Sequence, residues 1–239
     1  MKTETEKLAK TETIGWTLEP SSATVIWGEP QKIEISKEDL TSYNMCPAHI
    51  NHNSKHYQIL SPYDVELTFD KDKKFFNHKK ANIPEDNIFS DFHGNGVFKV
   101  MPDEGWLWDK PIFQINTPYI FFSDNKNAMI EIMAPIKHYH NYPGIVMNGA
   151  YNIYNWIRPL NFGLHWIDTD KPFILKKGEP LFTIRVSGVN NYKLQYQKWD
   201  SDLQTMKNEI HRVTSQVKNS FSFAKNLFHR RPKYLIKRS

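Results

Sequence analysis

The 239-residue sequence is poor in cysteine and glycine and has no long apolar run. Its single cysteine, Cys46, excludes an internal disulfide. No run of about eighteen apolar residues occurs, so we expect no transmembrane segment. Residues 1–13 are too charged for a secretory signal and predict a disordered N-terminus. We therefore expect a soluble, cytoplasmic protein.

The sequence also lacks the short motifs of the common enzyme classes. It contains no nucleophile elbow, phosphate-binding loop or dinucleotide-binding fingerprint. Gly94 and Gly96 are too few for a phosphate cradle and are typical of a hairpin turn. Acidic residues are scattered, without a spacing typical of paired catalytic carboxylates. Whether the protein is an enzyme is left open, and we expect no cofactor.

What the sequence has is a series of short β-rich runs separated by Gly, Pro and Asn turns. Aromatic residues make up 14% of the chain, which favours a sheet core over a helix bundle. The runs are 23–27, 32–36, 65–69, 97–101, 112–115, 119–122, 129–133, 151–157, 162–167, 173–176, 181–186 and 192–196. They predict a two-sheet β-sandwich or jelly roll over residues 14–198, with Trp156 and Trp166 in its core. Residues 70–91 are charged and aperiodic, as in a long surface excursion.

Residues 199–239 predict a C-terminal helix and a basic tail. An apolar stripe at helical spacing consists of Leu203, Met206, Ile210, Val213, Val217, Ala224 and Leu227. Two interpretations are open for this stripe. It packs against the sandwich, or residues 203–227 form a homo-oligomer through a coiled coil.

Positive charge is concentrated at the C-terminal end. From Thr205 onward there are nine basic residues and one acidic residue, a net charge of +8, against −3 for the rest. The candidate residues for binding an anionic partner are Arg230, Arg231, Lys233, Lys237 and Arg238. The partner would be nucleic acid, an acidic protein or a membrane surface; the alternative is a solvated chain end.

Two histidine-containing features bear on metal binding. Cys46, His49, His52 and His56 have metal-like spacing, but the Pro, Asn and Ser among them favour a polar turn. His138 and His140 would share one face of a strand, and His165 would be a third ligand for one Fe, Mn or Zn ion in a cupin-like enzyme. No acidic residue occurs in the stretch 141–152 that follows His140, so an exposed loop is the preferred interpretation.

One aromatic pair is a candidate ligand-stacking site. Trp106 and Trp108 are two residues apart and would present a platform to a sugar ring or a base. Because tryptophan is so often buried, we favour a packing role for both rings.

Several segments, in order and spacing, resemble a family of uncharacterised bacterial and phage proteins known as a domain of unknown function. The resemblance covers residues 46–186 and rests on Cys46-Pro47, VEL (65–67), FHGNGVFKV (92–100), PYIFFSDNKNAMIEIMAP (118–135), NWIRPLNFGLHW (155–166) and KKGEPLFTIRV (176–186). The sequence departs from the family at Ser123–Lys126 and at Asn155. The resemblance implies the β fold and brings no established activity. It also suggests a phage-encoded protein, which would act in the host cytoplasm.

These observations lead to two functional hypotheses. The preferred one is a non-catalytic binding or assembly module with a basic arm for an anionic partner. The alternative is the small cupin-like metal enzyme built on His138, His140 and His165.

Overall fold

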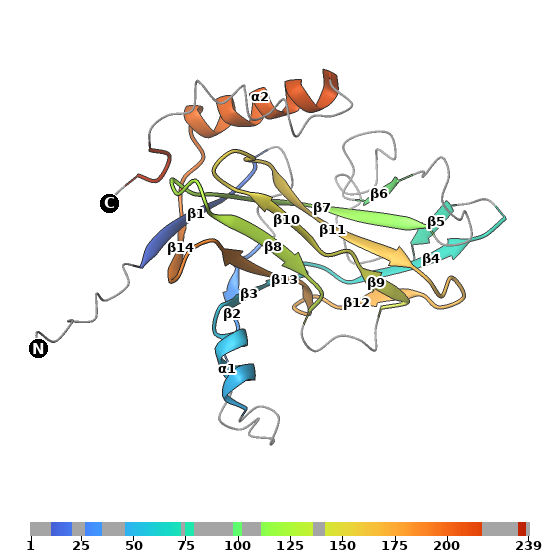
Figure 1. Cartoon of the computed structure of the whole chain (residues 1–239). Helices are drawn as coiled ribbons and strands as arrows, with labels where there is room; N and C mark the ends of the chain where they lie inside the picture. Colours follow the sequence, from blue (N-terminus) through green and yellow to red (C-terminus); the bar gives the residue numbers. More distant parts are fainter. Residues whose placement is uncertain are drawn as a thin grey trace, which may run out of the picture.

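The computed structural model describes residues 11–20, 27–34, 46–72, 75–78, 98–101, 111–135, 142–216 and 234–237. Fourteen strands and two helices lie within these ranges. The strands form a mainly β fold of stacked sheets with a helix packed outside, as the sequence predicts (Figure 1).

The first sheet has six strands in the order β14-β1-β7-β11-β9, with β6 also paired to β7. The strands are β14 (Tyr192–Tyr196), β1 (Glu12–Leu18), β7 (Ile112–Phe122), β11 (Pro159–Trp166), β9 (Gly144–Val146) and β6 (Phe98–Met101). Strand β1 runs parallel to β14 and antiparallel to β7. Because β1 begins at Glu12, the ordered domain starts before the predicted boundary at residue 14.

Two further sheets complete the fold. The five-stranded sheet has the order β10-β8-β13-β3-β2, and the three-stranded sheet has the order β12-β4-β5. Their strands are β10 (Gly149–Asn152), β8 (Met129–Met133), β13 (Pro180–Ser187), β3 (His56–Leu60), β2 (Gln31–Lys32), β12 (Phe173–Leu175), β4 (Val65–Asp70) and β5 (Phe75–His78). Strand β5 lies within the predicted surface excursion, so that prediction was wrong for residues 75–78.

The main core is aromatic and lies between the sheets. Phe113, Phe162 and Phe173 come from three different strands and meet with ring centroids 5.1–6.1 Å apart. Trp156 and Trp166 are both buried, as predicted, but only Trp166 lies in this core, whereas Trp156 belongs to a second apolar cluster. Trp166 packs against Phe113, with centroids 5.6 Å apart. The aromatic content of the sequence is therefore used largely to fill the space between sheets.

Helix α2 (Ser201–Gln216) lies across the outside of the six-stranded sheet (Figure 1). The Asp200 carboxylate accepts the backbone N–H of Leu203 and caps the helix. Leu203, Met206 and Ile210 are buried against the sheet in a second apolar cluster. For these three residues, packing of the stripe against the sandwich is confirmed. Their side chains are buried by contacts within the same chain.

The burial pattern along strand β7 reflects this second layer of packing. Its first half alternates buried and half-buried residues, whereas the residues from Thr117 to Phe122 are all buried. The second half is covered on both faces, because α2 lies outside it. Pro118 is accommodated within the strand at an irregularity in the β7–β11 register. The predicted division of this segment into two strands, 112–115 and 119–122, is therefore wrong.

The predicted strand 151–157 is also shorter than expected. Strand β10 ends at Asn152, whose Oδ1 accepts the backbone N–H groups of Tyr154 and Asn155. Such a side-chain turn ends a strand whatever the apolar content of the residues that follow.

Candidate functional site

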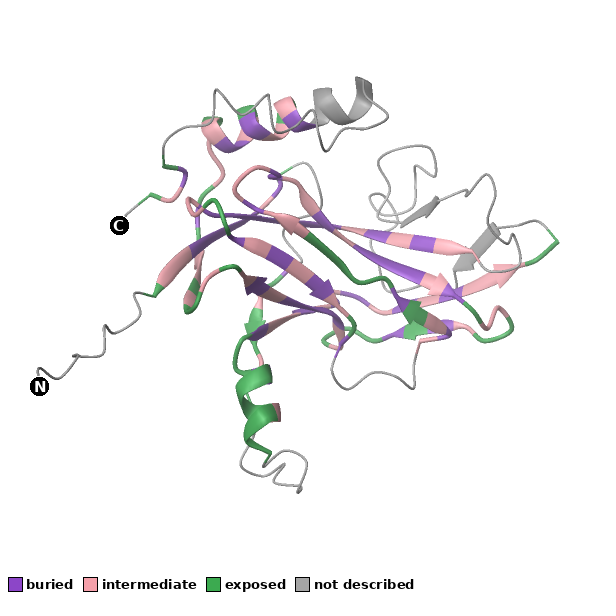
Figure 2. Cartoon of the chain, viewed as in Figure 1, coloured by how far each residue is buried: buried purple, intermediate pink, exposed green. Residues whose placement is uncertain are grey.

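A hollow lined by apolar and charged side chains lies on the described surface, beside the edge strands β9 and β12. Its volume is about 770 Å³, and its lining includes Ile145, Ile167 and Ile174. These three side chains are 62%, 41% and 36% exposed. We call this hollow the rim groove. Figure 2 shows the exposed stretch from β9 into β10 that borders it.

Tyr142 and Gly144 fix the wall of the rim groove. The Tyr142 hydroxyl donates to the carbonyls of Pro180 and Leu181, and its ring stacks on Phe173 at 5.0 Å. Burial raises the pKa of Tyr142, and the charge of Glu179 adds to this effect, so the phenol stays protonated as a donor. A Cβ at Gly144 would lie 2.0 Å from the His165 carbonyl oxygen, so only glycine lets β9 approach β11 here.

Charged groups of both signs border the rim groove. Lys171 pairs with Asp168 at 2.9 Å, and its hydrogen bond to the carboxylate is the main cause of the lowered pKa of Asp168. The Glu179 carboxylate accepts the backbone N–H of Lys176 at 2.8 Å. The described lining contains no histidine, cysteine or serine. The groove therefore offers apolar contact and charged groups of both signs.

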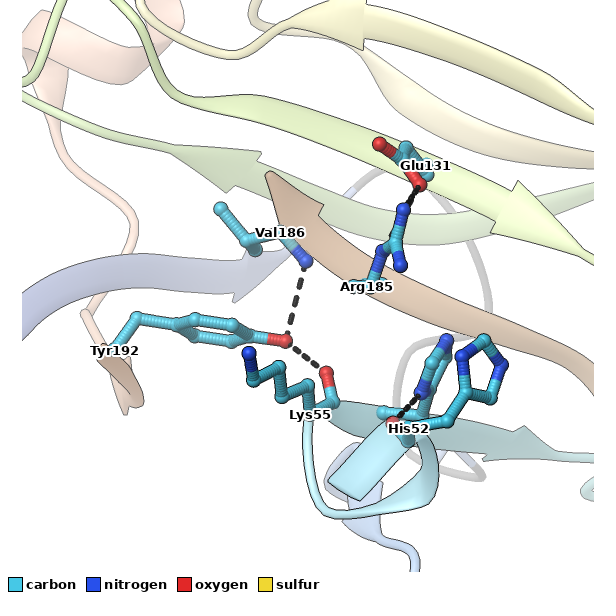
Figure 3. Close-up of polar contacts among 7 residues, drawn as sticks. His52, Lys55, Glu131, Arg185, Val186 and Tyr192 are labelled. Atoms are coloured by element: carbon cyan, nitrogen blue, oxygen red, sulfur yellow. Dashed lines mark hydrogen bonds and ion pairs between the residues drawn. The ribbon is translucent and has the colours of Figure 1, made fainter. Parts of the chain in front are cut away.

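A polar row on the five-stranded sheet is the second feature of interest. His56 on β3 lies opposite Arg185 on β13, and Arg185 lies opposite Glu131 on β8. Arg185 donates from Nε and Nη2 to Glu131 Oε2, at 3.0 and 2.6 Å (Figure 3). Burial opposes ionisation of Glu131, but hydrogen bonds from Ser187 and Arg185 outweigh it, so the pKa of Glu131 is lowered.

His56 and Tyr192 complete this polar row. The His56 Nδ1 donates to the His52 carbonyl at 2.5 Å, and the two imidazole rings lie 4.2 Å apart. Tyr192 accepts the Val186 N–H and donates to the Lys55 carbonyl (Figure 3). Burial raises the pKa of Tyr192 to about 12, so its proton stays in place. These contacts tie α1 (Pro47–Asn53) and β3 to β13 and β14, which is a structural role.

The Cys46 segment is a helix and a strand, so the predicted polar turn was wrong. Cys46 precedes α1, and His56 starts β3. Pro47 is compatible with the first helical position, because the N–H it lacks has no acceptor there. His49 Nε2 contacts Asn53 Nδ2 at 2.7 Å, which also links one turn of the helix. Within the described ranges, no three His, Cys, Asp or Glu side chains converge as a metal site would require.

Most of the predicted site residues lie outside the described part of the chain. This holds for His138, His140, Trp106, Trp108, Arg230, Arg231, Lys233 and Arg238. His165 is described and lies on β11 between the buried residues Leu164 and Trp166. Because side chains alternate along a strand, His165 projects from the face opposite to the core. The metal hypothesis and the stacking hypothesis stay untested.

The end of the C-terminal segment is docked on the body. The Asp124 carboxylate accepts the backbone N–H groups of Leu235 and Ile236, at 2.8 and 3.2 Å. Leu235 is buried in the cluster beneath α2. Lys237 forms an ion pair with Asp200 at 2.5 Å. Of the five predicted anion-binding residues, this one is therefore engaged within the chain.

The comparisons with known proteins do not assign a family. No protein-family model matches the sequence, and no curated protein does. Among solved structures, the chain resembles a dUTPase from phage phi11 of S. aureus at 9% identity and a TM-score of 0.38, covering 79% of this chain and 98% of that one. It also resembles a dUTPase of Staphylococcus bacteriophage 80alpha at 10% identity and a TM-score of 0.40, covering 80% and 100%. Likeness at this level carries no argument about activity.

The sequence did not predict the rim groove. From the sequence, the residues around 135–143 are expected to form an exposed loop, and no strand is expected between 133 and 151. The signal was the short apolar run Ile145-Val146-Met147 after Pro143-Gly144. Three residues are too few to show a period, so only the tertiary pairing with β11 reveals that this run is an edge strand.

In the described part of the chain, neither helix is long and apolar enough to cross a membrane.

Proposed function

We propose that this protein is a non-catalytic binding or assembly module whose contact surface is the rim groove. The observation that carries the proposal is the distribution of exposed apolar side chains. Seven large apolar side chains are exposed in the described part, and four of them belong to one region, namely Ile145, Met147, Ile167 and Ile174. Three of these line the rim groove, and Met147 follows β9 directly.

Leaving these apolar side chains exposed to water is unfavourable in free energy. Burying apolar area contributes about 25 cal/mol per Å², so gathered exposed side chains favour a protein contact far more than the same side chains scattered singly. The rigid setting adds to this effect. The groove is framed by two paired strands and by the anchored ring of Tyr142, so little conformational entropy is lost when a partner binds.

The basic arm is the second part of the proposal. Arg230, Arg231, Lys233 and Arg238 would contact an anionic partner, while Leu235 and Lys237 hold the segment between them on the body. We also propose that the protein is phage-encoded and acts in the host cytoplasm, on the strength of the resemblance to the family of unknown function.

The test combines a search for ligands with a groove variant. A displayed library of random extended peptides is selected against the full chain, and self-association is followed by light scattering. We expect an Ile145→Asp/Ile174→Asp variant to lose binding of the selected peptides and any self-association that is observed. Ile50→Asp, which changes an isoleucine 44% exposed on α1, is the control and should keep them. If no contact depends on Ile145 and Ile174, the proposed function is wrong.

A further inference from the structure

The outer edge of β9 makes no backbone hydrogen bond to another strand among the described residues. Met147 donates its N–H to the Gly163 carbonyl, and Ile167 donates to the Pro143 carbonyl. In an antiparallel pair, bonded positions alternate with positions whose groups point the other way. Positions 143, 145 and 147 therefore face β11, and the N–H and C=O groups of Gly144 and Val146 face away from it.

No described strand lies beyond β9. It is the last strand of the six-stranded sheet, so the groups of Gly144 and Val146 point outward from the described fold. Pro143 does not block this edge, because its missing N–H belongs to the side that faces β11. Ile145, at the centre of the strand, is the most exposed of the large apolar residues in the described ranges.

Two of the other sheet edges, β2 and β14, carry a residue that usually prevents strand pairing. Strand β2 is Gln31-Lys32, both exposed, and β14 presents the exposed Lys193. Lysine on an edge strand opposes pairing because the partner strand would bury its charge. Strand β9, Gly-Ile-Val, has no charged residue. Strands β10 and β12 are uncharged edges as well, but β9 alone among these three carries a large apolar side chain as exposed as Ile145, at 62%.

We propose that two copies of this chain associate by antiparallel pairing of β9 with β9. This inference rests on the proposed function and names the partner. A two-fold axis passes through Ile145, so Gly144 pairs with the partner's Val146 and Val146 pairs with the partner's Gly144. Both pairs use the outward groups, which gives four hydrogen bonds and joins the two six-stranded sheets. The two Ile145 side chains then face each other as a non-hydrogen-bonded pair.

A second copy fits the charges of this surface better than a partner of one charge sign. The border of the rim groove carries Lys171 and Lys176 together with Asp168 and Glu179, two charges of each sign. The same surface on a second copy therefore brings no net repulsion. The spacing of the free backbone groups is likewise symmetric about Ile145.

The first experiment measures self-association by sedimentation velocity across a concentration series. We expect a dimer whose dissociation constant rises about tenfold or more in Ile145→Lys, because two lysines would then oppose each other on the axis. Ile50→Lys makes the same exchange on α1 and should leave the dimer unchanged. A monomer at all concentrations, or a dimer equally weakened by both variants, overturns the proposal.

The second experiment tests the axis itself by cross-linking. In a Cys46→Ser background, Ile145→Cys places two thiols directly opposite each other, at about 4.5–5.5 Å between Cβ atoms. With diamide as the oxidant, we expect a disulfide-linked dimer, whereas Ile50→Cys in the same background should stay monomeric. Equal cross-linking of the two variants would show random collision and count against β9 pairing.

The outcomes separate this inference from the proposed function. If the chain is monomeric but a selected peptide binds and is lost in the Ile145→Asp/Ile174→Asp variant, self-pairing is wrong and the binding module stands. If neither self-association nor peptide binding depends on the rim groove, both the β9 pairing and the proposed function are wrong.

Discussion

His56 and Arg185 occupy directly opposite positions on strands β3 and β13, on the face of the sheet turned away from the main core. His56 donates its Nδ1 proton to the His52 carbonyl, and its buried Nε2 has no hydrogen-bond partner. Burial is the main cause of the lowered pKa of His56, and the charges of His52 and Arg185 add to it, whereas the hydrogen bond to the His52 carbonyl and the charge of Glu131 partly offset it. His56 is therefore neutral in the folded protein near pH 7.

This relationship predicts a pH-dependent free energy of unfolding. The unfolded imidazole titrates near pH 6.5, above the lowered pKa in the folded state, so between these values the unfolded chain binds more protons. The contribution of His56 to stability is thus fully present above about pH 6.5 and is lost as the pH falls through the folded pKa. Urea unfolding at pH 8 and pH 5 measures it.

The matched variants are His56→Gln and His165→Gln. We expect His56→Gln to lose less stability between pH 8 and pH 5 than the unchanged protein, although it is less stable at pH 8. His165 lies on the outer face of β11, and its replacement should leave the pH-dependent loss intact. An identical loss in all three proteins would show that His56 does not titrate as described.

The ion pair of Arg185 and Glu131 gives a second prediction, on coupling energy. Both side chains are partly buried, at 34% and 23% exposure, and two donors of Arg185 reach one carboxylate oxygen. A double-mutant cycle with Arg185→Ala and Glu131→Ala should give a coupling of about 1–2 kcal/mol in the free energy of unfolding. It is measured by urea denaturation of the four proteins.

An exposed ion pair in the same chain is the control for this cycle. Lys71 and Asp170 are separated by 2.8 Å, but their side chains are 52% and 84% exposed. Solvent screening should keep their coupling below about 1 kcal/mol. Equal coupling for the two pairs would mean that burial does not strengthen the Arg185–Glu131 contact.

Much of the fold could be predicted because alternation along strands is a local signal. Strands β8 and β14 begin and end where the sequence indicates, and β13 extends the alternating run Leu181–Val186 by one residue on each side. Strand β1 was missed because its residues Gly15 to Leu18 are buried or half-buried without alternation, and its partners are distant in sequence.

The candidate site was less predictable, because its residues become a site only through tertiary pairing. Ile145 and Ile174 are 29 positions apart and lie on edge strands of two different sheets. The histidine spacing was a visible signal, but spacing fixes no geometry in a segment without a period. The sequence could not show that His56 would be buried in a strand while His52 stayed on the exposed helix.

Docking of the C-terminal segment predicts that Leu235 contributes to stability. Leu235 is buried with Ile120, Phe122 and the residues of α2, so Leu235→Ala should cost about 2–5 kcal/mol in the free energy of unfolding. Tyr234→Ala, at a side chain 61% exposed, is the control and should cost far less. Thermal and urea unfolding measure both. Equal effects would mean that residues 234–237 do not pack on the body.

The docked segment also changes how the basic arm must be tested. Deleting residues 229–239 would remove Leu235 and the Lys237–Asp200 ion pair, so a loss of binding would be confounded with a loss of folding. Neutralising Arg230, Arg231, Lys233 and Arg238 to Gln keeps both contacts. We expect this variant to elute from a heparin column at clearly lower salt, because clustered cations release more counterions from a polyanion than dispersed ones.

The matched control for the arm removes the same charge from dispersed sites. The four exposed lysines Lys32, Lys126, Lys177 and Lys193 are changed to Gln, which gives the same net charge as the arm variant. Their distribution over separate elements prevents simultaneous contact with one polyanion, so elution should shift only slightly. If the arm itself binds the polyanion, the two variants should elute at different salt concentrations although their net charge and stability are equal. If they elute at the same salt concentration, net charge alone explains the binding, and the arm is a solvated chain end.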